Sequence, residues 1–176
     1  MTVSILVLST SLNANSKSRL LAQSFQSELE ASGASVDWLD LQEHELPFCG
    51  VEGAWDNAEI KALRTRVEAC DGILVASPIY NYDVNAAAKN FIEFTGGAWT
   101  QKVVAMAVSA GGLRSGMAPL GFINSLMLDF RCIVLPRYVY AVDDAYDDSG
   151  QPSEATVERI NDLSRELVRV TKALRS

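Results

Sequence analysis

The chain has 176 residues, of which 48% are hydrophobic, and this is enough for one domain, residues 1–176, with a single sizeable core. With 15 Lys and Arg against 22 Asp and Glu, the formal charge is -7. This balance disfavours a nucleic-acid partner, and an anionic ligand must be held locally by backbone amides, hydroxyl groups or a helix N-terminus.

The cysteine pattern and the N-terminal segment indicate a soluble protein of a reducing compartment. Three cysteines occur without a C-x-x-C spacing, so neither a disulfide framework nor a metal site is predicted. The apolar run Val3–Leu8 has no basic leader and is too short for a signal peptide, so it indicates a first strand. No stretch approaches the roughly 20 apolar residues of a membrane span. We therefore expect a cytoplasmic protein without membrane contact.

Five segments have the length and apolar character of strands. Three of them are nearly unbroken apolar runs, which is typical of parallel strands that are buried on both faces. The five segments are Ser4–Ser9, Ser35–Asp40, Gly72–Ser77, Lys102–Ser109 and Arg131–Leu135.

Helical periodicity fills the intervals between these strands. Leu21, Phe25 and Leu29 recur at every fourth position in the first interval. In the second interval, Asp56 and Glu59 form a start that resembles a capping box. The later helices are expected at Asn85–Thr95, Met117–Phe130 and Ser153–Leu174. Because crossovers between parallel strands are right-handed, this alternation predicts a three-layer α/β/α sandwich around a five-stranded parallel sheet of order 2-1-3-4-5.

Three loops carry unusual chemistry, and the predicted topology brings them together. In an open parallel sheet, ligands bind beyond the carboxyl ends of the strands, where the strand order reverses. The loops after the first, third and fourth strands should face one another at that edge. These loops are Ser9–Ser18, Ser77–Asp83 and Ser109–Gly116.

The first loop is rich in hydroxyl and amide side chains and leads into a helix. Ser11, Ser16 and Ser18 can donate hydrogen bonds to a phosphate, and the helix dipole favours a negative charge there. The same residue types are preferred helix N-caps, so a phosphate cradle and an elaborate N-cap both explain the composition. Neither G-x-x-x-x-G-K-[ST] nor G-x-G-x-x-G occurs, so neither a nucleoside triphosphate site nor a Rossmann dinucleotide site is predicted.

The other two loops can approach a flat ligand. Pro78 stiffens the second loop, and Tyr80 with Asn81 can offer an aromatic face and main-chain donors to a heterocycle. A turn with two partly buried tyrosines is the alternative interpretation. In the third loop, Gly111 and Gly112 allow a backbone to approach a ligand without obstruction by side chains.

Together these segments resemble the NADPH-dependent FMN reductase family, a branch of the flavodoxin-like flavoproteins that includes chromate, quinone and azo-compound reductases. The most specific element is Ser77-Pro78-Ile79-Tyr80-Asn81 followed by Ala88-Lys89-Asn90, which is similar to the S/T-P-x-Y-N and L-K-N segments of the family. The chain departs from the family at Ser9-Thr10-Ser11, where Gly-Ser and a nearby Arg are common, and it has no Arg before Arg19. The resemblance implies a flavodoxin-like fold and a homodimer or homotetramer.

The resemblance also implies which residues bind FMN. Those around the phosphate would be Ser9, Ser11, Asn13, Ser16 and Ser18. Those along the ribityl chain and ring would be Pro78, Ile79, Tyr80 and Asn81, and those at the pyrimidine end would be Ser109, Gly111 and Gly112. Tyr80 and Arg114 are candidates to border the open face of the ring, where Arg114 can meet a nucleotide phosphate.

The implied activity is hydride transfer from NADPH or NADH through bound FMN to a small acceptor, such as a flavin, a quinone, an azo compound or a metal oxyanion. The flavin would carry this chemistry, so no catalytic side chain is assigned. Two alternatives stay open: an FMN-binding electron-transfer protein without nicotinamide turnover, and a module for a phosphoryl ligand other than flavin. A receiver domain would need acidic residues at the strand ends where Ser9 and Ser77 stand.

Overall fold

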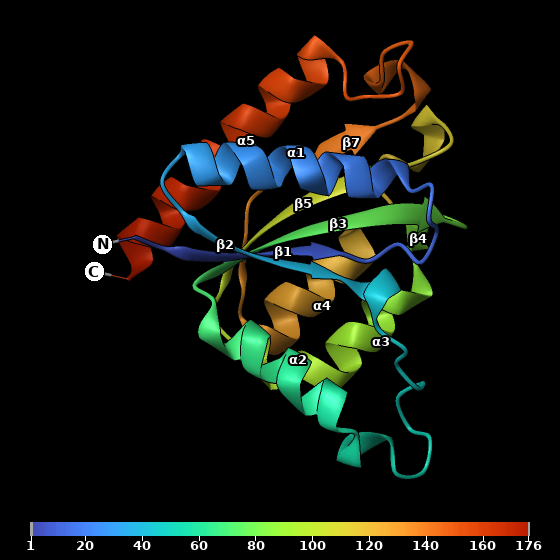
Figure 1. Cartoon of the computed structure of the whole chain (residues 1–176), viewed down its shortest axis with the longest axis vertical. Helices are drawn as coiled ribbons and strands as arrows, with labels where there is room; N and C mark the ends of the chain where they lie inside the picture. The colour runs from blue at the N-terminus through green and yellow to red at the C-terminus, as the bar shows by residue number, and fades with distance from the viewer. Residues whose placement is uncertain (1, 176) are drawn as a thin grey trace.

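A parallel sheet with the strand order β2-β1-β3-β5-β6 forms the centre of the protein (Figure 1). The computed structural model describes residues 2–175. The strands are β1 (Ser4–Ser9), β2 (Ser35–Asp40), β3 (Gly72–Tyr80), β4 (Asp83–Val84), β5 (Val103–Ser109), β6 (Ile133–Val134) and β7 (Val139–Ala141). Since β5 and β6 occupy the fourth and fifth positions, the predicted order 2-1-3-4-5 is confirmed.

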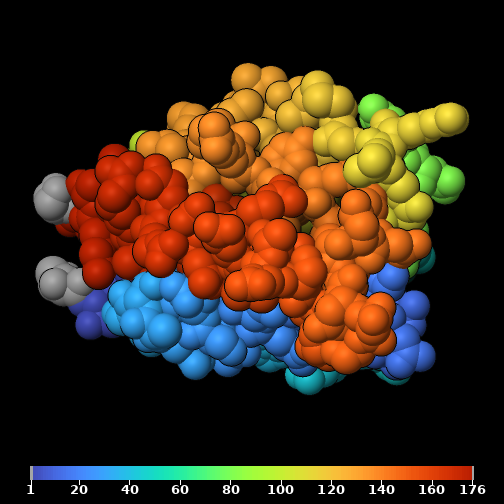
Figure 2. All heavy atoms as spheres, turned by 90° about the horizontal axis from the view of Figure 1, so that it is seen from above, coloured from blue at the N-terminus to red at the C-terminus, as the bar shows by residue number. Residues whose placement is uncertain are grey.

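Helices cover both faces of this sheet. Figure 1 shows α1 and α5 on one face and α2, α3 and α4 on the other, and Figure 2 shows α5 lying along α1. The helices are α1 (Lys17–Ala31), α2 (Ala58–Ala69), α3 (Ala86–Thr95), α4 (Leu120–Phe130) and α5 (Glu154–Leu174). The predicted three-layer arrangement is therefore confirmed. Within residues 2–175, no helix has both the length and the apolar character needed to cross a bilayer.

The core lies in two layers, one on each side of the sheet. Ile5 and Val7 of β1 pack in the layer under α1 and α5, whereas Leu6 and Leu8 pack in the layer under α2 and α3. This division follows from the alternation of side chains along a strand. Because both faces are covered, β1 has no polar face, and this explains its unbroken apolar run.

The fifth strand differs from the predicted segment Arg131–Leu135. It is split into β6 and β7, which pair with different parts of β5. Leu135 still donates its N–H to the Val104 carbonyl at 2.8 Å, but Pro136 has no N–H to continue the ladder. Arg131 lies outside the sheet because it ends α4 in the left-handed conformation, with φ of 55°.

The segment after the third strand is a hairpin rather than a loop. β3 continues to Tyr80, three residues beyond its predicted end at Ser77, and then pairs with β4 in the antiparallel direction. Asn81 and Tyr82 form the connection with φ of 50° and 66°. Two residues with positive φ are what a tight hairpin needs to match the twist of its strands. With β4 and the split fifth strand, the sheet has seven strands instead of five.

Two helices start differently from the prediction. Asn57, not Asp56, caps α2, because its side-chain oxygen accepts two amide hydrogens of the first turn at 2.8 and 3.2 Å. α4 begins at Leu120, three residues later than predicted. Ala118 precedes Pro119, and the residue before a proline is disfavoured in the helical conformation.

Candidate active site

The loops after β1, β3 and β5 enclose a pocket of about 310 Å³ at the carboxyl edge of the sheet, on the right of Figure 1. Nine of the twelve residues predicted to bind a cofactor line this pocket, and they come from all three loops. The pocket is lined by Ser11, Asn13, Asn15, Ser16, Lys17, Ser18, Pro78, Ile79, Tyr80, Ser109, Ala110, Gly111 and Asp143.

Three of the predicted cofactor residues, Ser9, Asn81 and Gly112, do not line the pocket. Ser9 is the last residue of β1, it is completely buried, and its hydroxyl has no hydrogen-bond partner within residues 2–175. Because Ser9 still belongs to the strand, its side chain is packed inside the protein and not presented to a ligand. Asn81 lies at the tip of the β3–β4 hairpin, beyond the pocket wall that Tyr80 forms.

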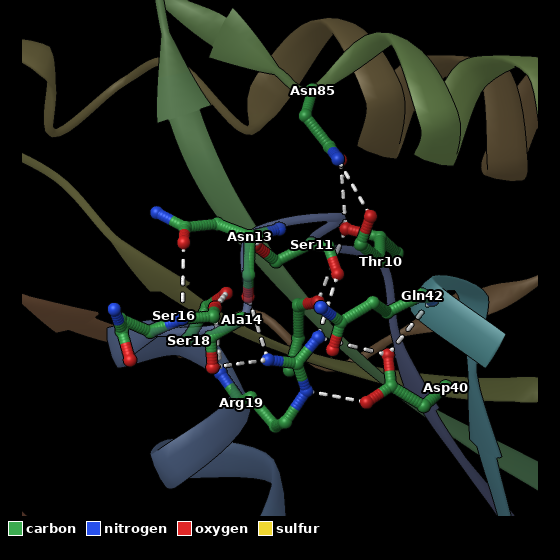
Figure 3. Close-up of polar contacts among 12 residues, drawn as sticks. Thr10, Ser11, Asn13, Ala14, Ser16, Ser18, Arg19, Asp40, Gln42 and Asn85 are labelled. Carbon is green, nitrogen blue, oxygen red and sulfur yellow. Dashed lines mark hydrogen bonds and ion pairs between the residues drawn. The ribbon is translucent and has the colours of Figure 1, made fainter.

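Arg19 holds the first loop in its shape (Figure 3). Its guanidinium pairs with Asp40 at the end of β2, and the two side chains are 11% and 5% exposed. Nη2 also donates to the Ser11 carbonyl at 2.9 Å, and Nη1 donates to the carbonyls of Asn13 and Ala14 at 2.7 and 3.2 Å. Arg19 therefore occupies three carbonyl oxygens of the loop that would otherwise repel an anion.

The start of α1 lies on the pocket wall. Ser16 caps the helix, since its Oγ accepts the N–H of Arg19 at 3.1 Å, and it also lies 2.9 Å from Oγ of Ser18. The N-cap interpretation is thus confirmed for Ser16. The amides of Lys17 and Ser18 belong to the first turn, which a helix leaves without internal acceptors. These amides give the pocket the donors that an anion needs.

Asn85 ties the first loop to the end of β3. Its Oδ1 accepts hydrogen bonds from the hydroxyls of Thr10 and Ser77 at 2.7 and 3.1 Å, and its Nδ2 donates to the Thr10 carbonyl at 2.6 Å. The sequence indicated Asn85 only as a helix start. The polar residues Thr10 and Ser77, each at the end of an apolar run, were the available signal, because buried polar groups need hydrogen-bond partners.

Two tyrosines that the sequence analysis did not assign hold the third loop. The hydroxyl of Tyr140, on β7, donates to the Gly112 carbonyl, and that of Tyr138 donates to the Gly116 carbonyl. Burial raises the pKa of Tyr138, so this donor keeps its proton at neutral pH. Both ends of the Gly112–Gly116 segment are therefore attached to the split fifth strand.

Gly111 has open space in front of its backbone. A Cβ added there would meet no atom within 4 Å, and the residue does not have a positive φ. The folded chain alone therefore gives no reason for glycine at this position. The space that a side chain would fill adjoins the pocket, as expected where a backbone must approach a ligand closely.

The two residues predicted to meet a second substrate are both accessible. Tyr80 lines the pocket and is 55% exposed. Arg114 is exposed on the short 3-10 helix Leu113–Ser115, outside the pocket, and has no hydrogen bond or ion pair to any described residue.

A fourth segment completes the pocket. Asp143, in the segment after β7, lines the wall and accepts a hydrogen bond from Lys17 Nζ at 2.7 Å. Tyr146 in the same segment donates its hydroxyl to the Lys17 carbonyl and to Ser109 Oγ, each at 3.2 Å, and burial raises the pKa of this tyrosine. No motif marked this segment, because its contact with α1 spans more than 120 residues of sequence.

Replacing Asn85→Ala should lower the free energy of unfolding by roughly 1–3 kcal/mol, because it removes a buried amide that accepts from the hydroxyls of Thr10 and Ser77 and donates to the Thr10 carbonyl. Chemical denaturation measures this loss. Asn124→Ala, at an exposed position of α4, is the matched control and should change stability little. Equal stability of the two variants would contradict the role given to Asn85.

Comparison with known proteins identifies the family of this chain. The sequence model of the family described as NADPH-dependent FMN reductase matches residues 3–147. An NADPH azoreductase of Bacillus sp. (strain OY1-2) is 27% identical over 151 residues, which are 85% of this chain and 79% of that protein.

Two solved structures show the same fold. The flavoenzyme NAD(P)H:(acceptor) oxidoreductase FerB from Paracoccus denitrificans has a TM-score of 0.79 at 19% identity over 98% of each chain. A flavodoxin from the domain Archaea has a TM-score of 0.68 at 16% identity over 96% of this chain and 98% of that one, so the flavodoxin-like fold is confirmed. The chain belongs to the NADPH-dependent FMN reductase family of oxidoreductases, which use FMN and a nicotinamide nucleotide.

Proposed function

We propose that the pocket at the carboxyl edge of the sheet is the FMN site and that the protein transfers hydride from NADPH or NADH to a small acceptor. The observation that carries this proposal is the meeting of a donor-rich loop, a hairpin and a glycine loop at one pocket. The names of three relatives, an NADPH azoreductase, an NAD(P)H:quinone oxidoreductase and an NADH-dependent FMN reductase, support an azo compound, a quinone or a flavin as the acceptor.

The residues at the α1 end of the pocket fit a phosphate. The hydroxyl of Ser11 and the first-turn amides of Lys17 and Ser18 would hold it, together with one hydroxyl of the Ser16–Ser18 pair, in which the other hydrogen is used between the two serines. Ser11 Oγ accepts the N–H of Asn13 at 3.3 Å, which leaves its own hydrogen for a ligand. This end of the pocket has the donors for a monoester without a cluster of basic side chains.

The opposite end of the pocket fits a planar ring. Pro78, Ile79 and Tyr80 form one wall with the restricted backbone of a strand and a proline, and Gly111 leaves space on the other side. Bound FMN would supply the hydride-accepting chemistry there. The chain's own residues bind the cofactor and orient it, and this assignment needs no acid or base among them.

The nicotinamide nucleotide and the acceptor would use the same open side of the pocket in turn. Tyr80 can stack on either molecule, and the unpaired Arg114 can meet a nucleotide phosphate. Because one place serves both substrates, the first product must leave before the acceptor binds.

Gly111→Val should weaken FMN binding at least about tenfold, a change of about 1.4 kcal/mol, because its side chain would fill the space left for the ring. Quenching of FMN fluorescence on titration measures the dissociation constants. Gly97→Val is the control, since an added Cβ at Gly97 meets only Arg64 at 3.5 Å, an ordinary contact, and it lies outside the pocket. Unchanged affinity in the Gly111 variant would contradict the placement of the ring.

Anaerobic addition of NADPH to the FMN-loaded protein should bleach the flavin absorbance, and steady-state rates should give parallel double-reciprocal lines. Both results follow from two substrates that share one site. An electron-transfer protein without nicotinamide turnover would keep its yellow colour. Intersecting lines would count against the shared site.

We also propose that the protein forms a homodimer or homotetramer through α3 and α4. Apolar side chains of α4 and the segment before it are exposed, with Leu128 at 81%, Met117 at 60% and Met127 at 40%. Light scattering should give the mass of two or four chains. Leu128→Glu should lower this mass, because it places a charge in the apolar contact. Leu174→Glu, at an exposed position of α5, is the control. A monomer at micromolar concentration would refute the assembly.

A further inference from the structure

An ion pair lies on the wall of the proposed phosphate end of the pocket. Lys17 Nζ lies 2.7 Å from Asp143 Oδ1, and both residues line the pocket beside Ser16 and Ser18. Among the described residues of this wall, Lys17 is the only cation and Asp143 is the only carboxylate. In Figure 2 the segment after β7 lies against the start of α1, which brings the two side chains together.

Asp143 is an unexpected neighbour for an anion. The hydrogen bond from Lys17 and its charge hold the pKa of Asp143 below its usual range, so the carboxylate is ionised at neutral pH. A phosphate monoester carries a charge of about -1.5 to -2 at pH 7. A phosphate bound at this wall would therefore meet the attraction of Lys17 and the repulsion of Asp143 together.

Arg19 cannot serve as the cation for the phosphate. Its five N–H groups are all used, by the two oxygens of Asp40 and by the carbonyls of Ser11, Asn13 and Ala14. Removing the guanidinium from this buried pair would leave Asp40 uncompensated, which is costly.

Lys17, by contrast, is held weakly at its charged end and firmly at its backbone. The side chains of Lys17 and Asp143 are 50% and 83% exposed, and an exposed pair contributes little stability. The Lys17 carbonyl accepts the hydroxyl of Tyr146 at 3.2 Å, and Nζ lies 5.1 Å from the centre of the Tyr146 ring. The ammonium group can therefore change partners while the main chain stays in place.

We propose that Lys17 exchanges Asp143 for the phosphate of FMN, and that this pair sets the preference of the pocket for a phosphorylated flavin over riboflavin. The proposal rests on the FMN site proposed above. In the free protein Asp143 balances the charge of Lys17. In the complex the dianion takes that place, and Asp143 opposes it from the same wall.

Dissociation constants for FMN and for riboflavin, measured by quenching of flavin fluorescence at low salt, test the proposal. Lys17→Met should weaken FMN binding about tenfold, because a charge-assisted hydrogen bond is lost, and should leave riboflavin binding unchanged. Asp143→Asn should tighten FMN binding by about threefold, because repulsion is removed. Lys61→Met, which removes an exposed lysine of α2 that lies beside Asp56, is the matched control and should change neither constant.

The comparison of the two ligands separates a phosphate contact from a structural effect. If Lys17→Met weakens FMN and riboflavin equally, or weakens neither while the wild-type protein binds FMN, the exchange is overturned. If the wild-type protein binds neither ligand, the proposed FMN site fails as well. Loss of the FMN preference in Lys17→Met, with a stronger preference in Asp143→Asn, supports the exchange.

Discussion

The buried pairing of Arg19 with Asp40 is the constraint on which the proposed site depends. It joins the start of α1 to the end of β2 and takes up the carbonyl oxygens of the loop between β1 and α1. Breaking a buried ion pair by removing one partner typically costs about 3–5 kcal/mol, so the loop is held in one conformation before any ligand arrives. Preorganisation of this kind lowers the entropic cost of binding.

In the proposed site, this arrangement would let a chain with a formal charge of -7 hold an anion. Arg19 neutralises Asp40 and donates hydrogen bonds to loop carbonyls, so it has no donor left for the ligand. The donors that face the pocket are short-range ones, namely hydroxyls and first-turn amides, whose effect does not depend on net charge. Asn85 fixes the same loop to β3, and so joins the two loops that carry the proposed phosphate end and the proposed ring end of the pocket.

Much of the fold could be predicted from the sequence, because local periodicity determines it. The apolar runs gave the bounds of β1 and β2 without error, and the alternation of strands and helices gave the order of the sheet. The prediction of a single fifth strand was wrong, because Pro136 has no N–H to continue the hydrogen-bond ladder after Leu135. The β3–β4 hairpin was missed because its turn uses Asn81 and Tyr82 and has no glycine.

The residues of the candidate site could be predicted only where a recognisable sequence pattern lies within a single loop. Ser11, Ser16 and Ser18 of the first loop and the Pro78–Tyr80 segment do line the pocket, whereas Ser9 is buried in the strand and Asn81 lies outside the pocket. Asp143 and Tyr140 were missed, since each acts on a loop that is distant in sequence, and only the folded chain brings them together.

The most direct test of the account is a crystal structure of the protein with FMN. We expect the phosphate to lie at the start of α1, within hydrogen-bond distance of the amides of Lys17 and Ser18, while Arg19 stays paired with Asp40. A phosphate bound elsewhere, or an Arg19 that leaves Asp40 to reach it, would contradict the central claim.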